Sequence, residues 1–188
     1  MSRKSRTEFA ILGMLTHGPL SGYDLKQLFE ERIAHFWAES IGQIYPTLKK
    51  LAKAGMVKAK ETEGHAGPKR IEYRITAKGT KYLRGWLHEP TGKEHVRNEL
   101  LLKLFFGPNS EADSMMAQIE MFESLQKAVQ KQFEHYVERI EDEPGSDLQK
   151  VYWRICLRSG QLVNEARIKW CRESRKALED YAKSESKR

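Results

Sequence analysis

The spacing of apolar residues changes twice within residues 1–88, and this change constrains the fold more than any other feature of the chain. Apolar residues three and four apart predict amphipathic helices, and the segments with this spacing are 7–15, 21–32 and 40–54. After Gly55 the apolar residues alternate, which predicts two strands at 56–61 and 70–75. The helical spacing returns after Thr76. We expect three helices, a two-stranded hairpin and a further helix, in that order.

Polar residues mark where several of these elements should begin and end. Ser21 and Thr76 are the expected helix N-caps, because their side-chain oxygens can accept hydrogen bonds from unpaired backbone N–H groups. The glycine-rich segment 64–69 predicts a loop that is too long for a tight hairpin. This order of elements is that of a winged helix-turn-helix domain with a two-stranded wing, and we expect it to span residues 1–88.

Pro46 complicates the start of the third helix. Ser40 and Gln43 fit a capping box, in which each side chain pairs with the backbone of the other residue. Pro46 has no N–H, and its ring would crowd the carbonyl of the residue four positions earlier. Two alternatives follow: the first turn is distorted, or the regular helix begins nearer Tyr45.

The second part of the chain is expected to be entirely helical, so the fold class is mainly α. Segment 97–106 is apolar almost all round and should be buried on most sides. Two long stretches of apolar residues at helical spacing, the first preceded by Ser110 and the two separated by residues 143–146, predict an antiparallel helix pair at 111–142 and 147–182. The expected stripe of the last helix is Leu148, Tyr152, Ile155, Leu162, Ala166, Trp170, Ala177 and Tyr181. We expect this helical domain to span residues 93–188.

The basic charge of the chain is concentrated in the expected winged-helix domain. Residues 1–88 contain 16 Lys and Arg against 8 Asp and Glu, whereas residues 89–188 contain 17 against 18. The net charge of +7 therefore arises entirely in the first part. A basic domain of this kind indicates a polyanionic partner.

The third helix is the expected DNA-reading element. Its non-core face presents Ser40, Gln43, Thr47, Lys49, Lys50 and Lys53. A helix fits the major groove, Gln can pair with adenine, and Lys reaches guanine edges or phosphates. The alternative is an ordinary solvated helix face. The wing favours DNA binding, because Lys69 and Arg70 add positive charge beside this helix and are expected to bind phosphate.

Several short motifs in the first domain resemble the PadR family of transcriptional regulators. They include Gly22-Tyr23-Asp24-Leu25, Tyr45-Pro46-Thr47-Leu48 and Tyr73-Arg74-Ile75-Thr76-Ala77-Lys78-Gly79. The resemblance covers roughly residues 7–88 and implies regulators, usually repressors, that dimerise through C-terminal helices and bind inverted repeats in double-stranded DNA. The DNA contacts that it implies are Tyr23, Ser40, Gln43, Tyr45, Lys49, Lys69 and Arg70. The remainder, with its best match at 98–106, resembles the subclass with a virulence-activator-type C-terminal domain.

The two tyrosines of this set have two interpretations. Tyr23 and Tyr45 can pack the second helix against the third, or point their hydroxyl groups at phosphate. We expect both at once, with the ring buried and the oxygen at the DNA.

The C-terminal helices are expected to form a homodimer, because their apolar stripes exceed what one helix pair can bury against itself. The residues assigned to this interface are Leu101, Leu104, Phe105, Phe122, Val129 and Trp170. A candidate pocket for a small-molecule effector is formed by Tyr152, Trp153, Cys156 and Trp170. The alternative interpretation of these four residues is that they are ordinary core side chains.

Other classes of protein have little support in the sequence. The six histidines are scattered and no nucleophile or phosphate-binding motif occurs, so we expect no enzyme, no cofactor and no metal site. Cys156 and Cys171 would lie roughly 22 Å apart on one helix, which excludes an intrachain disulfide. No 18-residue apolar run occurs, so we expect a cytoplasmic protein without a membrane segment. The remaining alternatives are an effector- or metal-responsive sensor, or an interaction scaffold, in which DNA binding is secondary.

Overall fold

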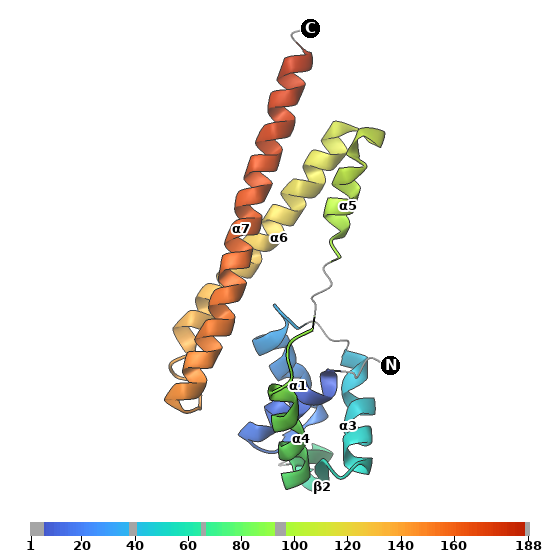
Figure 1. The fold of residues 1–188 in the computed structure, drawn as a ribbon, viewed down its shortest axis with the longest axis vertical. Coiled ribbons are helices and arrows are strands. Elements are labelled where there is room, and N and C mark those ends of the chain that lie inside the picture. Colours follow the sequence, from blue (N-terminus) through green and yellow to red (C-terminus); the bar gives the residue numbers. More distant parts are fainter. Residues whose placement is uncertain (1–5, 38–40, 65–66, 93–96, 187–188) are drawn as a thin grey trace. The chain divides into compact units, whose positions relative to one another are not determined.

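The computed structural model describes residues 6–37, 41–64, 67–92 and 97–186 (Figure 1). The chain divides into two compact units, Met1–Lys93 and Glu94–Arg188. Within the described ranges, no helix combines the length and the apolar character needed to cross a membrane.

The first unit is a winged helix-turn-helix. Its elements are α1 (Thr7–Met14), a 3-10 turn (Leu15–His17), β1 (Leu20–Ser21), α2 (Gly22–Leu28), a π-helical turn (Phe29–Ile33), a 3-10 turn (Ile41–Gln43), α3 (Ile44–Lys53), β2 (Val57–Gly64), β3 (Gly67–Ile75) and α4 (Ala77–Leu87). Apolar side chains from the helices and from β2 form one core, in which Ile11, Leu12, Leu25, Leu48 and Leu51 have at most 1% of their surface exposed. The expected order of elements is confirmed.

Both expected N-caps of this unit are present. The Ser21 hydroxyl accepts a hydrogen bond from the Asp24 backbone, and the Asp24 carboxylate accepts one from the Ser21 backbone, which completes a capping box. Thr76 caps α4 by accepting from the backbone N–H of Gly79 at 3.1 Å. Thr76 also donates to the carbonyl of Gly55 at 2.8 Å, so the start of α4 is tied to the segment that follows α3.

The structure decides between the two alternatives at Pro46. The regular helix α3 begins at Ile44, and a 3-10 turn over Ile41–Gln43 precedes it. Pro46 is therefore the third residue of α3, where a backbone N–H has no carbonyl to bond within the helix. The expected capping box is not the start of α3, since the N-cap is Gln43 and has no side-chain cap. Ser40 lies outside the described residues.

The two strands of the wing are longer than expected. The strand order is β1-β3-β2, all antiparallel, and β2 pairs with β3 from Val57 opposite Ile75 to Gly64 opposite Gly67. The predicted loop at 64–69 is wrong, because Gly64 pairs with Gly67 and β3 begins at Gly67, with an irregularity between Thr62 and Gly64. The short strand β1, which pairs Leu20 with Tyr73, was not predicted.

The second unit is a short helix followed by a long helical hairpin. Its elements are α5 (Glu99–Phe105), a 3-10 turn (Gly107–Asn109), α6 (Ala112–Arg139) and α7 (Asp147–Glu185). Ser110 does not cap α6, because the 3-10 turn places the N-cap at Glu111. Ser146 caps α7 in a capping box with Gln149. The expected antiparallel helix pair is confirmed, and α6 packs along α7.

The interface inside the hairpin contains several buried polar groups. Asn164 of α7 is 3% exposed and donates to the Gln126 carbonyl of α6 at 3.0 Å. Glu123, also 3% exposed, lies 3.0 Å from the guanidinium of Arg175 and 2.7 Å from the ammonium group of Lys127. The contacts of Asn164 with Gln126 and of Arg175 with Glu123 join the two helices and help to fix their register, which apolar packing alone specifies less strictly.

The face of α7 that packs on α6 is not the predicted stripe. The buried residues of α7 are Leu157, Asn164, Ile168 and Cys171. Tyr152, Ile155 and Leu162, which were expected in the stripe, are 50–62% exposed. This helix therefore carries two apolar faces, and the predicted one is left uncovered within a single chain.

Candidate DNA-binding surface

Helix α3 has one face in the core and one face in solvent. Ile44, Leu48 and Leu51 are at most 1% exposed and anchor the helix in the winged-helix core. Gln43, Lys49 and Lys53 are exposed on the remaining surface. Gln43 at the N-cap and the two lysines on the helix are side chains that can hydrogen-bond to base edges and phosphates.

Two residues predicted for this face have other contacts. Thr47 is only 7% exposed, so its placement on the non-core face was wrong; the turn of the helix brings it beside the buried Leu48. Lys50 is exposed, but its ammonium group donates to a carboxylate oxygen of Glu8 at 3.0 Å.

Glu8 is a buried carboxylate that joins three helices of this unit. It lies on α1, is 3% exposed, and accepts hydrogen bonds from Lys50 of α3 and from the Tyr82 hydroxyl of α4 at 2.6 Å. Burial, the hydrogen bond to Glu8 and the negative charges of Glu8 and Glu89 raise the pKa of Tyr82 to about 12. The network therefore ties α1 to both α3 and α4.

Tyr23 and Tyr45 lie where α2 meets α3, but their rings are not buried. Tyr23 is 58% exposed and Tyr45 is 52% exposed, so the expectation of a buried ring was wrong. A Cβ atom on Gly22 would lie 2.5 Å from the Tyr45 ring. The missing side chain at Gly22 therefore lets this ring rest directly on the start of α2, where it stays accessible.

The wing presents positive charge on the strands as well as near the turn. Lys58 of β2 lies opposite Arg74 of β3, and both are exposed, as is Lys60. Arg70 donates hydrogen bonds to Ser21 and Asp24 at the start of α2. The side chain of Lys69 lies outside the described part of the chain. Sequence reasoning missed the acidic partners Glu8 and Asp24, because a carboxylate in a basic domain has no local signature until its partner is known.

The four residues assigned to an effector pocket do not come together within one chain. All of them lie on the continuous helix α7, where Trp153 and Trp170 are separated by roughly 25 Å of helical rise. Tyr152 and Cys156 are exposed, whereas Trp170 packs edge-on against Phe122 of α6. The expectation of one pocket from these residues is therefore wrong for the isolated chain.

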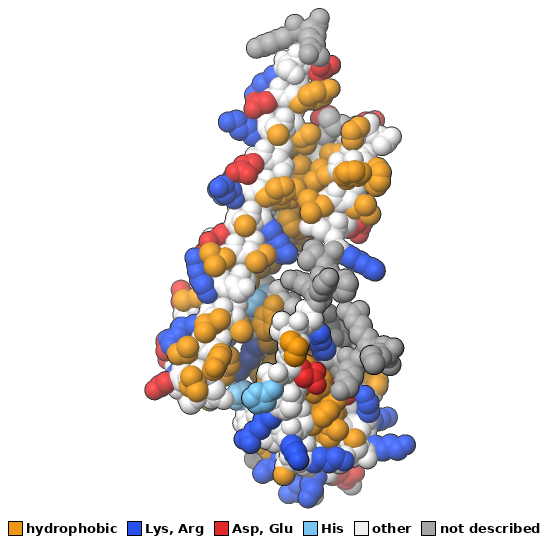
Figure 2. All heavy atoms as spheres, in the orientation of Figure 1, with side chains coloured by type: hydrophobic (Ala, Val, Ile, Leu, Met, Phe, Trp, Pro, Cys, Tyr) orange, Lys and Arg blue, Asp and Glu red, His pale blue; other side chains and the backbone are white. Residues whose placement is uncertain are grey.

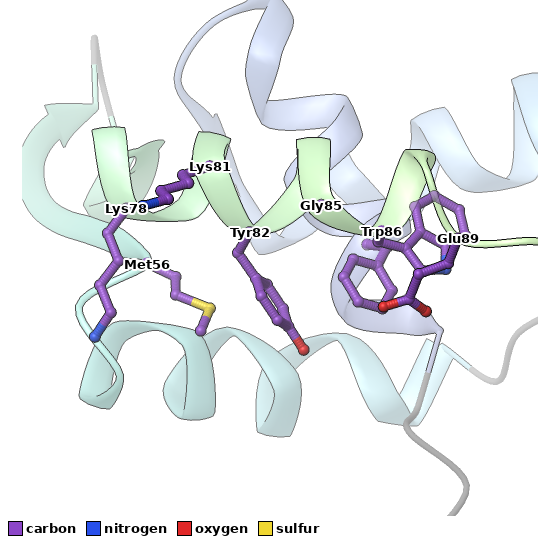
Figure 3. A pocket seen from close by; sticks show the side chains of 8 residues that line it. Met56, Lys78, Lys81, Tyr82, Gly85, Trp86 and Glu89 are labelled. Atoms are coloured by element: carbon purple, nitrogen blue, oxygen red, sulfur yellow. The ribbon is translucent and has the colours of Figure 1, made fainter.

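A pocket of about 350 Å³ lies instead in the winged-helix unit, along α4 (Figure 3). Tyr82 and Trp86 point into it beside Met56, and Trp86 stacks on Phe9 with ring centroids 4.6 Å apart. Its lining residues are Phe9, Met56, Lys78, Lys81, Tyr82, Gly85, Trp86 and Glu89. None of the residues predicted to bind an effector lines this pocket.

The residues assigned to a dimer interface fall into two groups. Leu101 and Phe105 of α5 are 49% and 80% exposed. Leu104, Phe122, Val129 and Trp170 are half-buried. Hydrophobic side chains are prominent on the face of α5, α6 and α7 shown in Figure 2. The expectation that 97–106 is buried on most sides does not hold within one chain, since no residue of α5 is buried.

A basic winged helix in which α3 has an exposed face, followed by a helical hairpin with uncovered apolar faces, is typical of two-domain winged-helix regulators. Residues 11–85 match the Transcriptional regulator PadR-like family, and residues 96–179 match the family described as Virulence activator alpha C-term. The chain belongs to the PadR-like family of transcriptional regulators, in the group with a virulence-activator-type C-terminal domain.

Relatives with known names agree with this assignment. The chain is 39% identical over 101 residues to Negative transcriptional regulator PadR of Bacillus subtilis; it spans about half of that relative's length, because the match covers 53% of this chain and 55% of that protein. The crystal structure of the PadR-like regulator BC1756 from Bacillus cereus is similar with a TM-score of 0.78 and 25% identity, over 93% of this chain and 98% of that one. The Vibrio cholerae virulence activator AphA is similar with a TM-score of 0.71 and 26% identity, over 93% and 98% of the two chains.

Proposed function

We propose that the chain is a homodimeric repressor that binds an inverted-repeat DNA operator with the exposed face of α3. The observation that carries this proposal is that α3 has one apolar, buried face and one polar, exposed face. Its apolar face is buried in the core, while Lys49 and Lys53 of the helix and Gln43 at its N-cap are exposed to solvent. In this arrangement Gln43 and Lys49 reach base edges, and Tyr23, Tyr45 and the wing contact the backbone.

The proposed dimer uses the apolar faces that a single chain leaves uncovered. Phe105 and Leu102 of α5 are 80% and 60% exposed, and Tyr152 and Ile155 of α7 are 62% and 60% exposed. Exposed apolar surface of this extent marks an interaction site. A second copy related by a twofold axis would cover it, and would place two α3 helices on two half-sites about one helical turn apart.

Repression is favoured by the named relatives, with activation as the alternative. The Bacillus subtilis relative is named a negative regulator, whereas AphA is named a virulence activator. A solved structure of Bacillus subtilis PadR, 24% identical to this chain, contains operator DNA, and another contains p-coumaric acid. We extend DNA binding and control by a small-molecule effector to this chain on that precedent, and place the regulator in the cytoplasm with its DNA target.

The test begins with selection of the genomic fragments that the full chain retains, followed by titration of one selected duplex and one random duplex. Gln43→Ala should cost about 1–3 kcal/mol on the selected duplex and little on random DNA, because it removes a base contact. Gln132→Ala, on the exposed surface of α6, is the matched control and should change neither affinity. No affinity for either duplex at low salt would refute the proposal. An equal loss of affinity for both duplexes would indicate that Gln43 contacts the DNA backbone and not a base.

Transcription from a promoter that contains the selected fragment then separates repression from activation. The proposal expects transcription to fall when the chain is supplied. A rise would favour activation, as in the relative named an activator.

A further inference from the structure

Arg70 reaches across the first unit, from the wing to the start of α2. It lies on β3, two residues before Glu72, which pairs with Ser21 of β1. Residues two apart on a strand share a face of the sheet, so Arg70 points to the side on which Ser21 lies. One guanidinium nitrogen of Arg70, Nη2, donates to the Ser21 hydroxyl at 2.9 Å and to Oδ1 of Asp24.

Asp24 uses its two oxygens for two different elements. Oδ2 accepts from the backbone N–H of Ser21 at 2.9 Å and closes the capping box of α2, while Oδ1 accepts from Arg70. Partial burial opposes ionisation of Asp24, but the hydrogen bonds from Ser21 and Arg70 outweigh it and lower the pKa of this carboxyl. The group is therefore charged at neutral pH, and a single carboxylate links the helix cap to the wing strand.

This ion pair lies between two parts of the proposed DNA-binding surface. Asp24 follows Tyr23 directly in the chain, and the strand that carries Arg70 continues into the turn of the wing. The side chains of Arg70 and Asp24 are 44% and 29% exposed, so the pair is at the surface but its donors and acceptors face each other. A guanidinium group engaged in this way is partly neutralised and held in one orientation.

We propose that Arg70 is a positioning residue that fixes the wing against α2 through Asp24, and that it is not one of the phosphate-binding side chains. This inference rests on the proposed function and revises the expectation that Arg70 binds phosphate. Arg70 then acts on DNA binding through the orientation of the wing relative to Tyr23 and α3. Its own charge contributes little, because Asp24 already balances it.

The two roles predict opposite effects for Asp24→Asn. If Arg70 contacts phosphate, removing Asp24 frees its guanidinium group and deletes a negative charge beside DNA, so binding tightens. If Arg70 positions the wing, the same substitution loosens the wing and weakens binding. The substituted amide oxygen can still accept from the Ser21 backbone, so the cap of α2 is kept in both cases.

The experiment titrates the full chain with a duplex selected by the wild-type protein. We expect Asp24→Asn to weaken binding by roughly three- to tenfold, the scale of a partly exposed ion pair. Glu72→Gln is the matched control: it removes a negative charge two residues from Arg70 on the same strand, and has no ion pair in the part of the chain that the structure describes. The control should bind as well as wild type or better. Tighter binding by both variants would overturn the proposal.

The salt dependence of binding gives a second reading. Arg70→Gln should weaken binding while leaving the slope of log affinity against log salt unchanged, whereas loss of one phosphate contact per subunit would flatten the slope of a dimer by about 1.8. The double variant Asp24→Asn with Arg70→Gln should bind about as weakly as either single variant, because both remove the same contact. Additive losses, or a flattened slope, would contradict the positioning role.

Amide hydrogen exchange of the free chain tests the same contact without DNA. Asp24→Asn should speed exchange in peptides covering residues 57–75, and Glu72→Gln should not. If the wild-type chain fails to bind duplex DNA at low salt, the proposed function is wrong, and the exchange measurement alone decides whether Asp24 holds the wing. Equal exchange in the two variants would refute the positioning contact.

Discussion

Glu8 shows how one buried residue can set the position of α3. Its carboxylate accepts from Lys50 of α3 at 3.0 Å and from Tyr82 of α4 at 2.6 Å. A buried carboxylate is costly unless its oxygens are paired, so the two donors are needed for α1 to keep Glu8 at this position. The side chain of Lys50 is 68% exposed, but the buried carboxylate of Glu8 holds its ammonium group in place.

The prediction for this network is that Glu8→Ala destabilises the winged-helix unit. The substitution leaves the half-buried hydroxyl of Tyr82 without its acceptor, so the free energy of unfolding in urea should fall by about 1–3 kcal/mol. Glu30→Ala, an exposed position on the π-helical turn, is the control and should stay within about 0.5 kcal/mol of wild type. Equal stability of the two variants would show that Glu8 is dispensable for the fold.

The pH dependence of the same network has a defined sign. Because the folded chain raises the pKa of Tyr82 from 10.0 to about 12, the protonated phenol contributes its full stability below pH 10, and this contribution is lost as the pH rises towards 12. In Glu8→Ala the hydrogen bond and the charge are both removed, so the pKa of Tyr82 should fall. Phenolate absorbance measures this pKa, and Tyr82→Phe identifies which transition belongs to Tyr82.

At the scale of elements, Gly79 and Gly22 of the winged helix differ in the atoms that an added Cβ would contact. A Cβ atom on Gly79 would lie 2.2 Å from the backbone carbonyl oxygen of Met56, which already accepts hydrogen bonds from Thr76. A Cβ atom on Gly22 would instead meet the ring of Tyr45, a side chain that is 52% exposed and free to turn outward. The first clash is with rigid backbone and the second with a movable side chain.

Gly79→Ala should therefore lower the free energy of unfolding by roughly 1–3 kcal/mol, the usual cost of overpacking. Gly22→Ala should change it by less than about 0.5 kcal/mol, because the Tyr45 ring can move aside. Urea unfolding of the two variants gives the comparison directly. A loss at Gly22 as large as at Gly79 would mean that the Tyr45 ring is a structural part of the helix-turn-helix.

The elements that could be predicted from sequence are those with strong local signals. Apolar spacing located the α-helices of the described residues to within a few positions, and Ser21 and Thr76 capped the expected helices. The regular start of α3 could not be decided, because Pro46 is acceptable in a first turn and disruptive later in a helix. β1 was missed because its partner β3 is far away in the chain, and the extension of the wing strands to Gly64 and Gly67 was missed because glycine is unusual inside strands.

The sequence predicted most of the exposed residues of the candidate site, but not the residues with which they form hydrogen bonds. Gln43 and Lys49 are exposed, as expected from the helical spacing of α3. Thr47 was misplaced because it lies at the border between the two faces, where one step of 100° decides burial. On α7 both faces are apolar, so the spacing alone did not indicate which one α6 covers.

The whole molecule separates two tasks along its length. The net positive charge arises from residues 1–88, which contain α3 and the wing, whereas the C-terminal unit is nearly neutral and exposes apolar side chains. Charge attracts DNA at long range, and apolar contact holds partners together at short range. The proposed dimer uses both properties, since it joins two basic reading units through neutral helices.

The last prediction concerns that dimer. Sedimentation of the intact chain at micromolar concentration should give twice the mass of one 21.9 kDa chain. Phe105→Glu should shift the protein towards the monomer, because it places a charge where an 80% exposed aromatic ring would be buried by the partner. Leu87→Glu makes the same kind of change at a 65% exposed position of α4 and should leave the dimer intact.

Operator binding should weaken together with dimerisation. A dissociated Phe105→Glu variant presents only one reading unit at a time, so it loses the high effective concentration of the second unit on the neighbouring half-site. Leu87→Glu should bind the operator as wild type does, which separates loss of the dimer from a general effect of added negative charge. A wild-type chain that sediments as a 21.9 kDa monomer and still binds its operator tightly would refute this architecture.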